Sequence, residues 1–184
     1  MTDVLWGNIF KPGASERGVV DILQAIPVFE GLSRRDLAAV DRTLHRRRFA
    51  AQEVIFHQGD AGVGMYVIQS GTVSIRIEPE GQQLAELRDG EFFGEIALLT
   101  EYPRSASAVA VTPCQALFLS QSDLFGLIRR NPKCGTKVLI QVAEIIGRRL
   151  IASNDVLRKL RGELAAARAE NERLRPSAAP KAGG

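Results

Sequence analysis

A chain of 184 residues with a formal net charge of +3 has room for one domain with a hydrophobic core and an appendage, and not for two ordinary domains. Its composition, 45% hydrophobic and 24% charged, is typical of a water-soluble globular protein, and it holds no apolar run long enough to cross a membrane. The first ten residues lack the basic start and apolar core of a secretory signal, so we expect a cytoplasmic protein. Cys114 and Cys134 are expected to be reduced thiols, and with only two histidines the chain is predicted to hold no metal site.

The N-terminal part of the chain is predicted to be a tail followed by helices. Residues 1–18 read as the tail, and residues 19–48 read as helical. Residues 33–36, SRRD, form a capping-box pattern, and apolar residues follow at helical spacing as far as Leu44. This region is basic through arginines at positions 34, 35, 42, 46, 47 and 48. We interpret them as a solvated helix face, with binding to a phosphate backbone as the alternative.

Between residues 50 and 119 the hydrophobic pattern changes to short strand-like runs separated by turn residues. The runs lie at residues 54–56, 65–68, 73–77, 84–87, 109–111 and 116–119. Several short strands at such spacing favour a closed antiparallel β-roll, or jelly roll, so the predicted fold class is α+β with flanking helices. Residues 94–100 lack alternation and are predicted to form a single helical turn between two strands.

Two helices are predicted to follow the strands. Residues 120–123, SQSD, form a second capping box and begin a helix that ends at Arg130, because the residue before Pro132 is pushed out of the helical region. Pro132 suits the first position of the next helix, which meets no breaker except isolated glycines for roughly forty residues and would be about 65 Å long. The predicted organisation is a tail, a ligand-binding domain, a long dimerisation helix and a disordered tail, at residues 1–18, 19–131, 132–175 and 176–184.

Residues 89–110, DGEFFGEIALLTEYPRSASAVA, carry the most informative pattern in the chain. Gly94 lets the backbone approach a ligand closely, and the helical turn behind it offers unpaired N–H groups to an anion. Arg104 could reach the same place once the connection folds back, and a guanidinium there would pair with phosphate oxygens. Hydroxyls at alternate positions of the following strand are supplied by Ser105 and Ser107. Glu95 is a carboxylate beside this anion site, which suits a ribose hydroxyl that needs an acceptor.

This segment resembles the phosphate-binding cassette of the cyclic nucleotide-binding domains found in catabolite activators, cyclic-nucleotide-dependent kinases and cyclic-nucleotide-gated channels. The family pattern is approximately F-G-E-[LIV]-A-L and, after a short connection, R-[AS]-A-[TS]-V-x-A. Here residues 93–98 read FGEIAL and residues 104–110 read RSASAVA. The lead-in IPVFEGLS at residues 26–33 also looks like the family, and the resemblance covers about residues 22–152. The departures from the pattern are Gln52 for a turn glycine, Val63 for an aspartate and Ala108 for a valine.

The resemblance implies a role for each residue of the cassette. Glu95 would bind the ribose 2′-OH, and Arg104 would bind the cyclic phosphate. Backbone or hydroxyl contacts are implied for Gly94, Ile96, Ala97, Ser105 and Ser107. The expected ligand is cAMP, with cGMP left open, and no cofactor is expected. The alternative is a degenerate cassette in which Arg104 and Glu95 merely form an ion pair.

Residues 150–175 carry a heptad pattern that predicts a parallel homodimeric coiled coil. The a positions are Leu150, Leu157, Leu164 and Asn171, and the d positions are Ser153, Leu160, Ala167 and Leu174. The charged positions match across a parallel pair, with Glu163 facing Arg168 and Glu170 facing Arg175. An asparagine at an a position favours two strands in register. The alternative is a single amphipathic helix packed on its own domain.

The long helix is also similar to the dimer helix of the catabolite activators, in which an Arg-Arg-Leu sequence is followed by a Thr-Ser pair that reaches the base. Here residues 148–150 read RRL, and Ser153 and Asn154 stand at the corresponding place. The resemblance therefore implies that both contact the purine across the dimer; the alternative is that Ser153 only interrupts the seam. A helix-turn-helix domain follows in those activators. None is expected after residue 184 here, so no sequence-specific DNA binding is expected.

Together these patterns predict a regulatory module that binds a ligand and is not an enzyme. The sequence shows no Ser-His-Asp set, metal cluster or carboxylate pair that would suggest catalysis. A bound cyclic nucleotide is expected to favour one arrangement of the cassette relative to the long helix, which is a population shift. An unidentified protein partner is expected to respond to this change. The alternative function is a constitutive dimeric scaffold or adaptor whose pocket stays empty and whose coiled coil is the working part.

Overall fold

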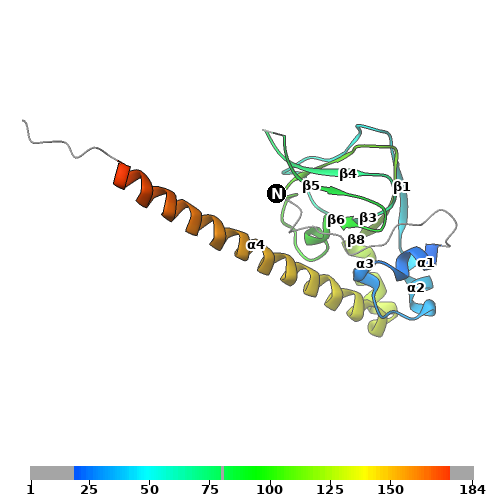
Figure 1. The fold of residues 1–184 in the computed structure, drawn as a ribbon. Coiled ribbons are helices and arrows are strands. Elements are labelled where there is room, and N and C mark those ends of the chain that lie inside the picture. The colour runs from blue at the N-terminus through cyan, green and yellow to red at the C-terminus, as the bar shows by residue number, and fades with distance from the viewer. Residues whose placement is uncertain (1–18, 80, 175–184) are drawn as a thin grey trace, which may run out of the picture. The chain divides into compact units, whose positions relative to one another are not determined.

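The computed structural model of the protein describes residues 19–79 and 81–174, so the predicted tails at 1–18 and 176–184 lie outside the described residues. Two four-stranded antiparallel sheets face each other, with helices beside them (Figure 1). The predicted α+β fold with an antiparallel β-roll is confirmed. By their contacts the residues divide into two units, Met1–Gly147 and Arg148–Gly184.

The N-terminal helices are shorter than the sequence predicts. The elements are α1 (Val19–Gln24), the 3₁₀ turn η1 (Pro27–Phe29) and α2 (Arg34–Asp41). The first capping box is confirmed, since the Ser33 Oγ accepts the N–H of Asp36 at 3.2 Å. The helix ends at Asp41, so the apolar Leu44 lies beyond it, where it is still buried.

The prediction of helix as far as residue 48 is wrong, because His45–Phe49 forms the strand β1. It pairs antiparallel with β8 (Cys114–Ser120) over five residues and lies at the edge of its sheet. The sequence HRRRF has no hydrophobic alternation to reveal a strand, and its first four residues are exposed. Charged residues suit an edge strand because they discourage pairing with another chain. The three arginines at positions 46–48 therefore belong to a sheet edge and not to a helix face.

The remaining strands complete the two sheets. They are β2 (Val54–Phe56), β3 (Gly64–Ser70), β4 (Val73–Ile77), β5 (Gln82–Leu87), β6 (Phe92–Phe93) and β7 (Ser107–Ala110). The strand orders are β1-β8-β3-β6 and β2-β7-β4-β5. The predicted helical turn between two strands is confirmed as η2 (Glu95–Leu98), which follows β6. It is held close to β3 and α3.

Two hydrophobic cores lie on opposite faces of the sheet that contains β3 and β8. Because side chains alternate along a strand, Met65 and Val67 of β3 face the helices, whereas Tyr66 and Ile68 face the interior of the roll. The same alternation in β8 explains why its apolar run is almost continuously buried. Figure 1 shows α1, α2 and α3 gathered beside this sheet. One core therefore joins the sheet to the helices, and the other fills the roll.

Helices α3 (Gln121–Arg130) and α4 (Pro132–Leu174) begin where the sequence predicts. The second capping box is confirmed, since the Ser120 Oγ accepts the N–H of Asp123 at 3.0 Å. The helices pack closely at Gly135, where a Cβ atom would lie 2.6 Å from the Cα of Ile128. In the first turns of α4, four buried residues join the helical core: Cys134, Val138, Val142 and Ile145. The first compact unit thus extends past the predicted boundary at residue 131.

The second unit, as far as it is described, is the continuation of α4. Its large apolar side chains are exposed within the single chain: Leu150 60%, Ile151 63%, Leu157 46%, Leu160 55% and Leu164 52%. The predicted partner of Glu170, Arg175, lies outside the described residues. No helix among the described residues is long and apolar enough to cross a membrane.

Candidate functional site

The backbone of Arg104 is held by the turn that precedes β3. The Arg104 N–H donates to the carbonyl oxygen of Asp60 at 2.8 Å, and the Arg104 carbonyl accepts the N–H of Gly59 at 2.9 Å. The Asp60 carboxylate in turn accepts the N–H of His57 at 2.8 Å, which closes the turn. The start of β7 is therefore fixed by a segment about forty residues earlier in the chain.

The side chain of Arg104 is buried at 7% exposure. Its guanidinium carbon lies 4.1 Å from the centre of the Phe56 ring and 5.9 Å from that of Tyr66, two residues that pack against the core inside the roll. Its Nη1 donates to the carbonyl oxygens of Gly64, at 2.8 Å, and Gly94, at 3.1 Å. Arg104 therefore packs against aromatic rings, and its guanidinium faces the backbone at the start of β3 and just before η2.

One atom of this guanidinium is exceptional. The Nε of Arg104 is a buried donor without a hydrogen-bond partner among the described residues. Buried polar atoms are almost always paired, because leaving one unpaired costs about 1–3 kcal/mol. Burial lowers the pKa of Arg104, and the charges of Tyr66, Asp60 and Glu95 raise it. An arginine stays protonated in such surroundings, so the site presents a positive charge and an unsatisfied donor to an acceptor.

Gly94 is required where η2 begins. Its φ of +74° lies in the left-handed region, which side chains with a Cβ avoid. A Cβ atom at this position would also lie 2.5 Å from the Nη1 of Arg104. Glycine thus allows the turn and the close approach of the guanidinium together. The expected close approach of the Gly94 backbone to a ligand remains a prediction.

The other cassette residues on η2 differ in accessibility. Glu95 is buried at 5% exposure, and its charge acts on Arg104. Ala97 is buried and packs against the turn before β3, where a Cβ on Gly62 would lie 2.6 Å from that of Ala97. Ile96 is 41% exposed. The structure therefore brings Gly94, Glu95, Ala97 and Arg104 together, while Ile96 can offer a ligand only its main chain or an exposed side chain.

The two serines of the cassette lie in different surroundings. Ser105 is exposed and adjacent to Arg104. Ser107 is 2% exposed, and its hydroxyl accepts the N–H of Gln58 at 2.7 Å and donates to the carboxylate of Glu78. Glu78 also bonds the Nδ1 of His57 at 3.0 Å, which raises the pKa of that histidine. The Ser107 hydroxyl is thus already used to fasten β7 to the β2 and β4 loops.

Three residues of the site were not assigned a role by sequence reasoning. Phe56 and Tyr66 form the aromatic surface under Arg104, and Gly64 supplies one of its carbonyl acceptors. A Cβ on Gly64 would lie 2.3 Å from the carbonyl oxygen of Leu119, so strand packing requires glycine there. In the sequence, the two aromatic residues could be seen only as members of strands that flank a glycine-rich turn. That pattern does not indicate that both rings contact Arg104.

The departure at Gln52 has a visible consequence. Gln52 adopts a φ of +65°, the left-handed conformation that the usual turn glycine would adopt freely. Its side chain donates to the carbonyl oxygen of Val111 at 3.2 Å, and its N–H donates to that of Ala110 at 2.7 Å. These bonds tie the turn before β2 to the end of β7 and help to hold the strained conformation.

Ser153 and Asn154 lie in the second unit and are exposed. The structure describes this unit by itself, so their contact with a base remains a prediction. Over the described ranges, no group of three or more His, Cys, Asp or Glu side chains is placed to hold a metal ion. Both cysteines are free and buried, and burial raises the pKa of Cys114 to about 11, which makes it a poor nucleophile.

The comparisons with known proteins agree with this geometry. A family model described as the cyclic nucleotide-binding domain matches residues 46–131. A cyclic AMP receptor protein of Thermus thermophilus is 39% identical over 131 residues, which cover 70% of this chain and 59% of that protein. Glutaminase 2 of Bradyrhizobium diazoefficiens is 30% identical over 142 residues, which cover 74% of this chain and 22% of that protein. This chain thus spans less than two thirds of either curated relative.

A solved structure matches over nearly its whole length. It is the N-terminal domain of a transcriptional regulator from Streptomyces coelicolor, with a TM-score of 0.63 and 30% sequence identity. The match covers 74% of this chain and 95% of that domain.

Proposed function

Because this chain belongs to the cyclic nucleotide-binding domain family, we propose that it is a cytoplasmic cyclic-nucleotide receptor that regulates a protein partner and has no catalysis of its own. The preferred ligand is cAMP, in keeping with the name of the Thermus relative, and cGMP is the other candidate. The glutaminase relative indicates that such a domain can be one part of a longer protein, which is compatible with a regulatory role.

The observation that carries this proposal is the buried guanidinium of Arg104, whose Nε has no hydrogen-bond partner in the part of the chain that the structure describes. A cyclic phosphate has one negative charge and two exocyclic oxygens, which one guanidinium can bind with paired hydrogen bonds. The aromatic rings and sheets around Arg104 lower the local dielectric, so this pairing is stronger than it would be in water. The exposed hydroxyl of Ser105, next to Arg104, is a further donor for the same phosphate.

Glu95 complements this phosphate site. Its carboxylate can only accept hydrogen bonds when ionised, so it suits the ribose 2′-OH and not the phosphate. It is buried one residue after Gly94, whose carbonyl already receives the Arg104 guanidinium. In the proposed complex Gly94, Ile96 and Ala97 contribute main-chain contacts along η2. The phosphate and ribose contacts are common to cAMP and cGMP, so selectivity has to come from contacts to the base.

The second unit supports the proposal of a parallel homodimer. Four leucines at a and d positions of the heptad pattern are about half exposed in the single chain: Leu150, Leu157, Leu160 and Leu164. A helix with such a stripe is stabilised when a second copy covers it. The polar positions Ser153 and Asn154 lie within the same stretch, which is compatible with their proposed contacts to a purine across the dimer.

Thermal unfolding with ligand tests the receptor function. We expect cAMP to raise the melting temperature, because a ligand present at one hundred times its Kd stabilises the folded state by about 2.7 kcal/mol. For a chain of this size that corresponds to a shift of roughly 5–10 °C. An unchanged melting temperature with millimolar cAMP, cGMP and a cyclic dinucleotide would contradict the receptor function and favour a constitutive scaffold.

Truncation after Gly147 tests whether the second unit takes part in binding. The buried core residues end at Ile145, so the shortened chain keeps the cores, Glu95 and Arg104. We expect it to bind cAMP roughly 5- to 150-fold more weakly, the factor that a typical coupling energy of about 1–3 kcal/mol implies. It should also discriminate less between cAMP and cGMP. Equal affinity and selectivity, measured by calorimetry, would show that the long helix does not contribute to the site.

A further inference from the structure

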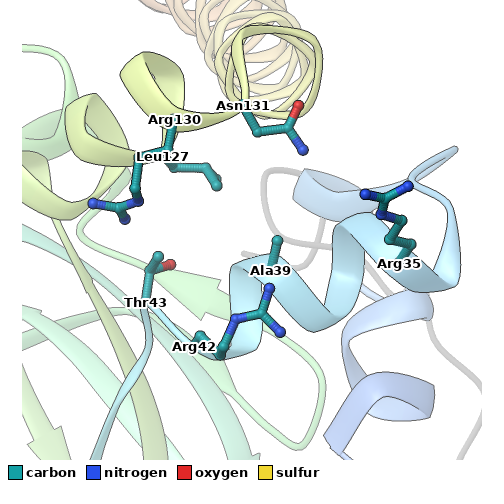
Figure 2. A pocket seen from close by; sticks show the side chains of 7 residues that line it. All are labelled: Arg35, Ala39, Arg42, Thr43, Leu127, Arg130 and Asn131. Atoms are coloured by element: carbon teal, nitrogen blue, oxygen red, sulfur yellow. The ribbon is translucent and has the colours of Figure 1, made fainter.

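A second candidate site lies on the helical side of the first unit. A pocket of about 490 Å³ is lined by Arg35, Ala39, Arg42, Thr43, Leu127, Arg130 and Asn131. Figure 2 shows that its walls come from two parts of the chain, α2 with the residues just after it, and the end of α3. Its volume is within the range of small-molecule sites, about 300–1,000 Å³.

Helical spacing explains the pocket. Arg35, Ala39 and Arg42 are four and three residues apart, so they share one face of α2 and its C-terminal cap. Leu127 and Arg130 are three residues apart on one face of α3. Ala39 is the shortest side chain of its row, which leaves room between the two rows, and the buried Leu127 gives the pocket an apolar wall.

The charge of the lining is entirely positive. Three arginines line the pocket and no acidic residue does, and the Arg130 guanidinium lies beside Gly126 of its own helix. In the part of the chain that the structure describes, none of the three arginines forms an ion pair within 4 Å. Of the α2 carboxylates, Asp41 pairs with Arg46 at 3.3 Å. Asp36 bonds Ser33 at 2.7 Å and the pocket residue Asn131 at 3.1 Å, and it also interacts with the charge of Arg35. Within the described residues the fold therefore neutralises the positive charge of the pocket only in part, through Asp36 beside Arg35.

We propose that this pocket binds a small ligand that carries two or more phosphate groups. Guanidinium groups bind phosphate oxygens through paired, charge-assisted hydrogen bonds. Three arginines carry more positive charge than a singly charged anion can neutralise. The ligand is therefore different from the cyclic nucleotide, which carries a single charge. The two sites are also built from different parts of the fold, since Arg104 lies against the core inside the roll and Leu127 belongs to the core beneath the helices. The phosphates can be those of a free metabolite or of a phosphorylated lipid headgroup.

The test uses the full chain and pyrophosphate as the soluble probe, titrated by calorimetry in buffer without divalent cations. Arg42→Gln and Arg130→Gln should each weaken pyrophosphate binding roughly 10- to 150-fold, the effect of removing a charge-assisted contact. Arg129→Gln is the matched control, because this exposed neighbour on α3 loses the same charge but does not line the pocket. We expect it to change the affinity by less than about threefold, because it makes no direct contact in the pocket and salt screens its longer-range charge.

Two further measurements separate the sources and the sites. Flotation with phosphatidylcholine vesicles that contain phosphatidylinositol bisphosphate shows whether the same arginines bind a lipid headgroup. Loss of vesicle binding in Arg42→Gln, but not in Arg129→Gln, would support a lipid as the source of the phosphates. Arg104→Ala should leave pyrophosphate binding unchanged, whether or not the chain binds cAMP. The proposal is overturned by binding to neither probe, by equal loss in the Arg129→Gln control, or by loss in an Arg104→Ala variant whose melting temperature matches that of the native chain.

Discussion

Replacing Arg104 by alanine should weaken cyclic nucleotide binding by about 3–5 kcal/mol, or roughly 150- to 5,000-fold. The phosphate would lose its counter-charge in a buried site, where an unpaired charge is costly. Glu95→Ala should cost less, about 1.5–3 kcal/mol, because it removes one charge-assisted hydrogen bond to a neutral hydroxyl. Isothermal titration calorimetry with cAMP measures both.

Arg104→Lys is the matched control, because it keeps the charge but loses the paired donors and the planar contact with Phe56. We expect an affinity between those of the native chain and Arg104→Ala. Thermal unfolding without ligand shows whether the variants fold, since Arg104 also donates to Gly64 and Gly94. A larger loss for Glu95→Ala than for Arg104→Ala would mean that the anchors are misassigned. Unchanged binding in both variants would favour a degenerate cassette in which the two residues only pair with each other.

The double variant Leu157→Asp with Leu164→Asp should convert the dimer to a monomer. Each leucine is half exposed in the single chain and would be buried in the proposed seam. Full burial of a leucine contributes about 1.5–3 kcal/mol, and about half of that is available to a half-exposed side chain. Loss of four in a dimer therefore costs on the order of 3 kcal/mol or more, or at least about 100-fold in the dimer Kd. Light scattering measures the mass, and circular dichroism shows whether the β-roll remains.

Ala165→Asp with Ala166→Asp is the control for this variant. These residues lie on the same helix, outside the a and d positions, and the change adds the same negative charge. The control should stay dimeric and keep its mass. An unchanged dimer in the leucine variant would place the interface elsewhere, and a monomer in both variants would attribute the effect to charge or helix propensity.

Local signals in the sequence predicted much of the fold. Both capping boxes, the break at Pro132 and the single turn at η2 were located correctly, because each depends on side chains within a few residues of the backbone that they affect. The strands with hydrophobic alternation were also found. Strand β6 was missed because it has only two residues. Strand β1 was taken for helix because HRRRF carries no alternation.

The candidate site was predicted in part. The spacing of Gly94, Glu95 and Arg104 resembles a known cassette, and the structure brings these three residues together. Their aromatic surroundings could not be derived, because Phe56 and Tyr66 come from other strands. The bonds of Ser107 to Gln58 and Glu78 were equally hidden, since they join residues 49 and 29 positions apart.

By itself, then, the sequence determined the caps, the turns, the alternating strands, the long helix and the residues of the cassette. These features depend on interactions over one or two turns of helix or on the two-residue period of a strand. The tertiary structure decided that β1 is a strand, because five residues of β8 pair with it. It also decided which face of Arg104 is buried and where Arg42 and Arg130 meet in one pocket. Such features depend on contacts between distant segments, whose free energy outweighs local preference only after the chain has folded.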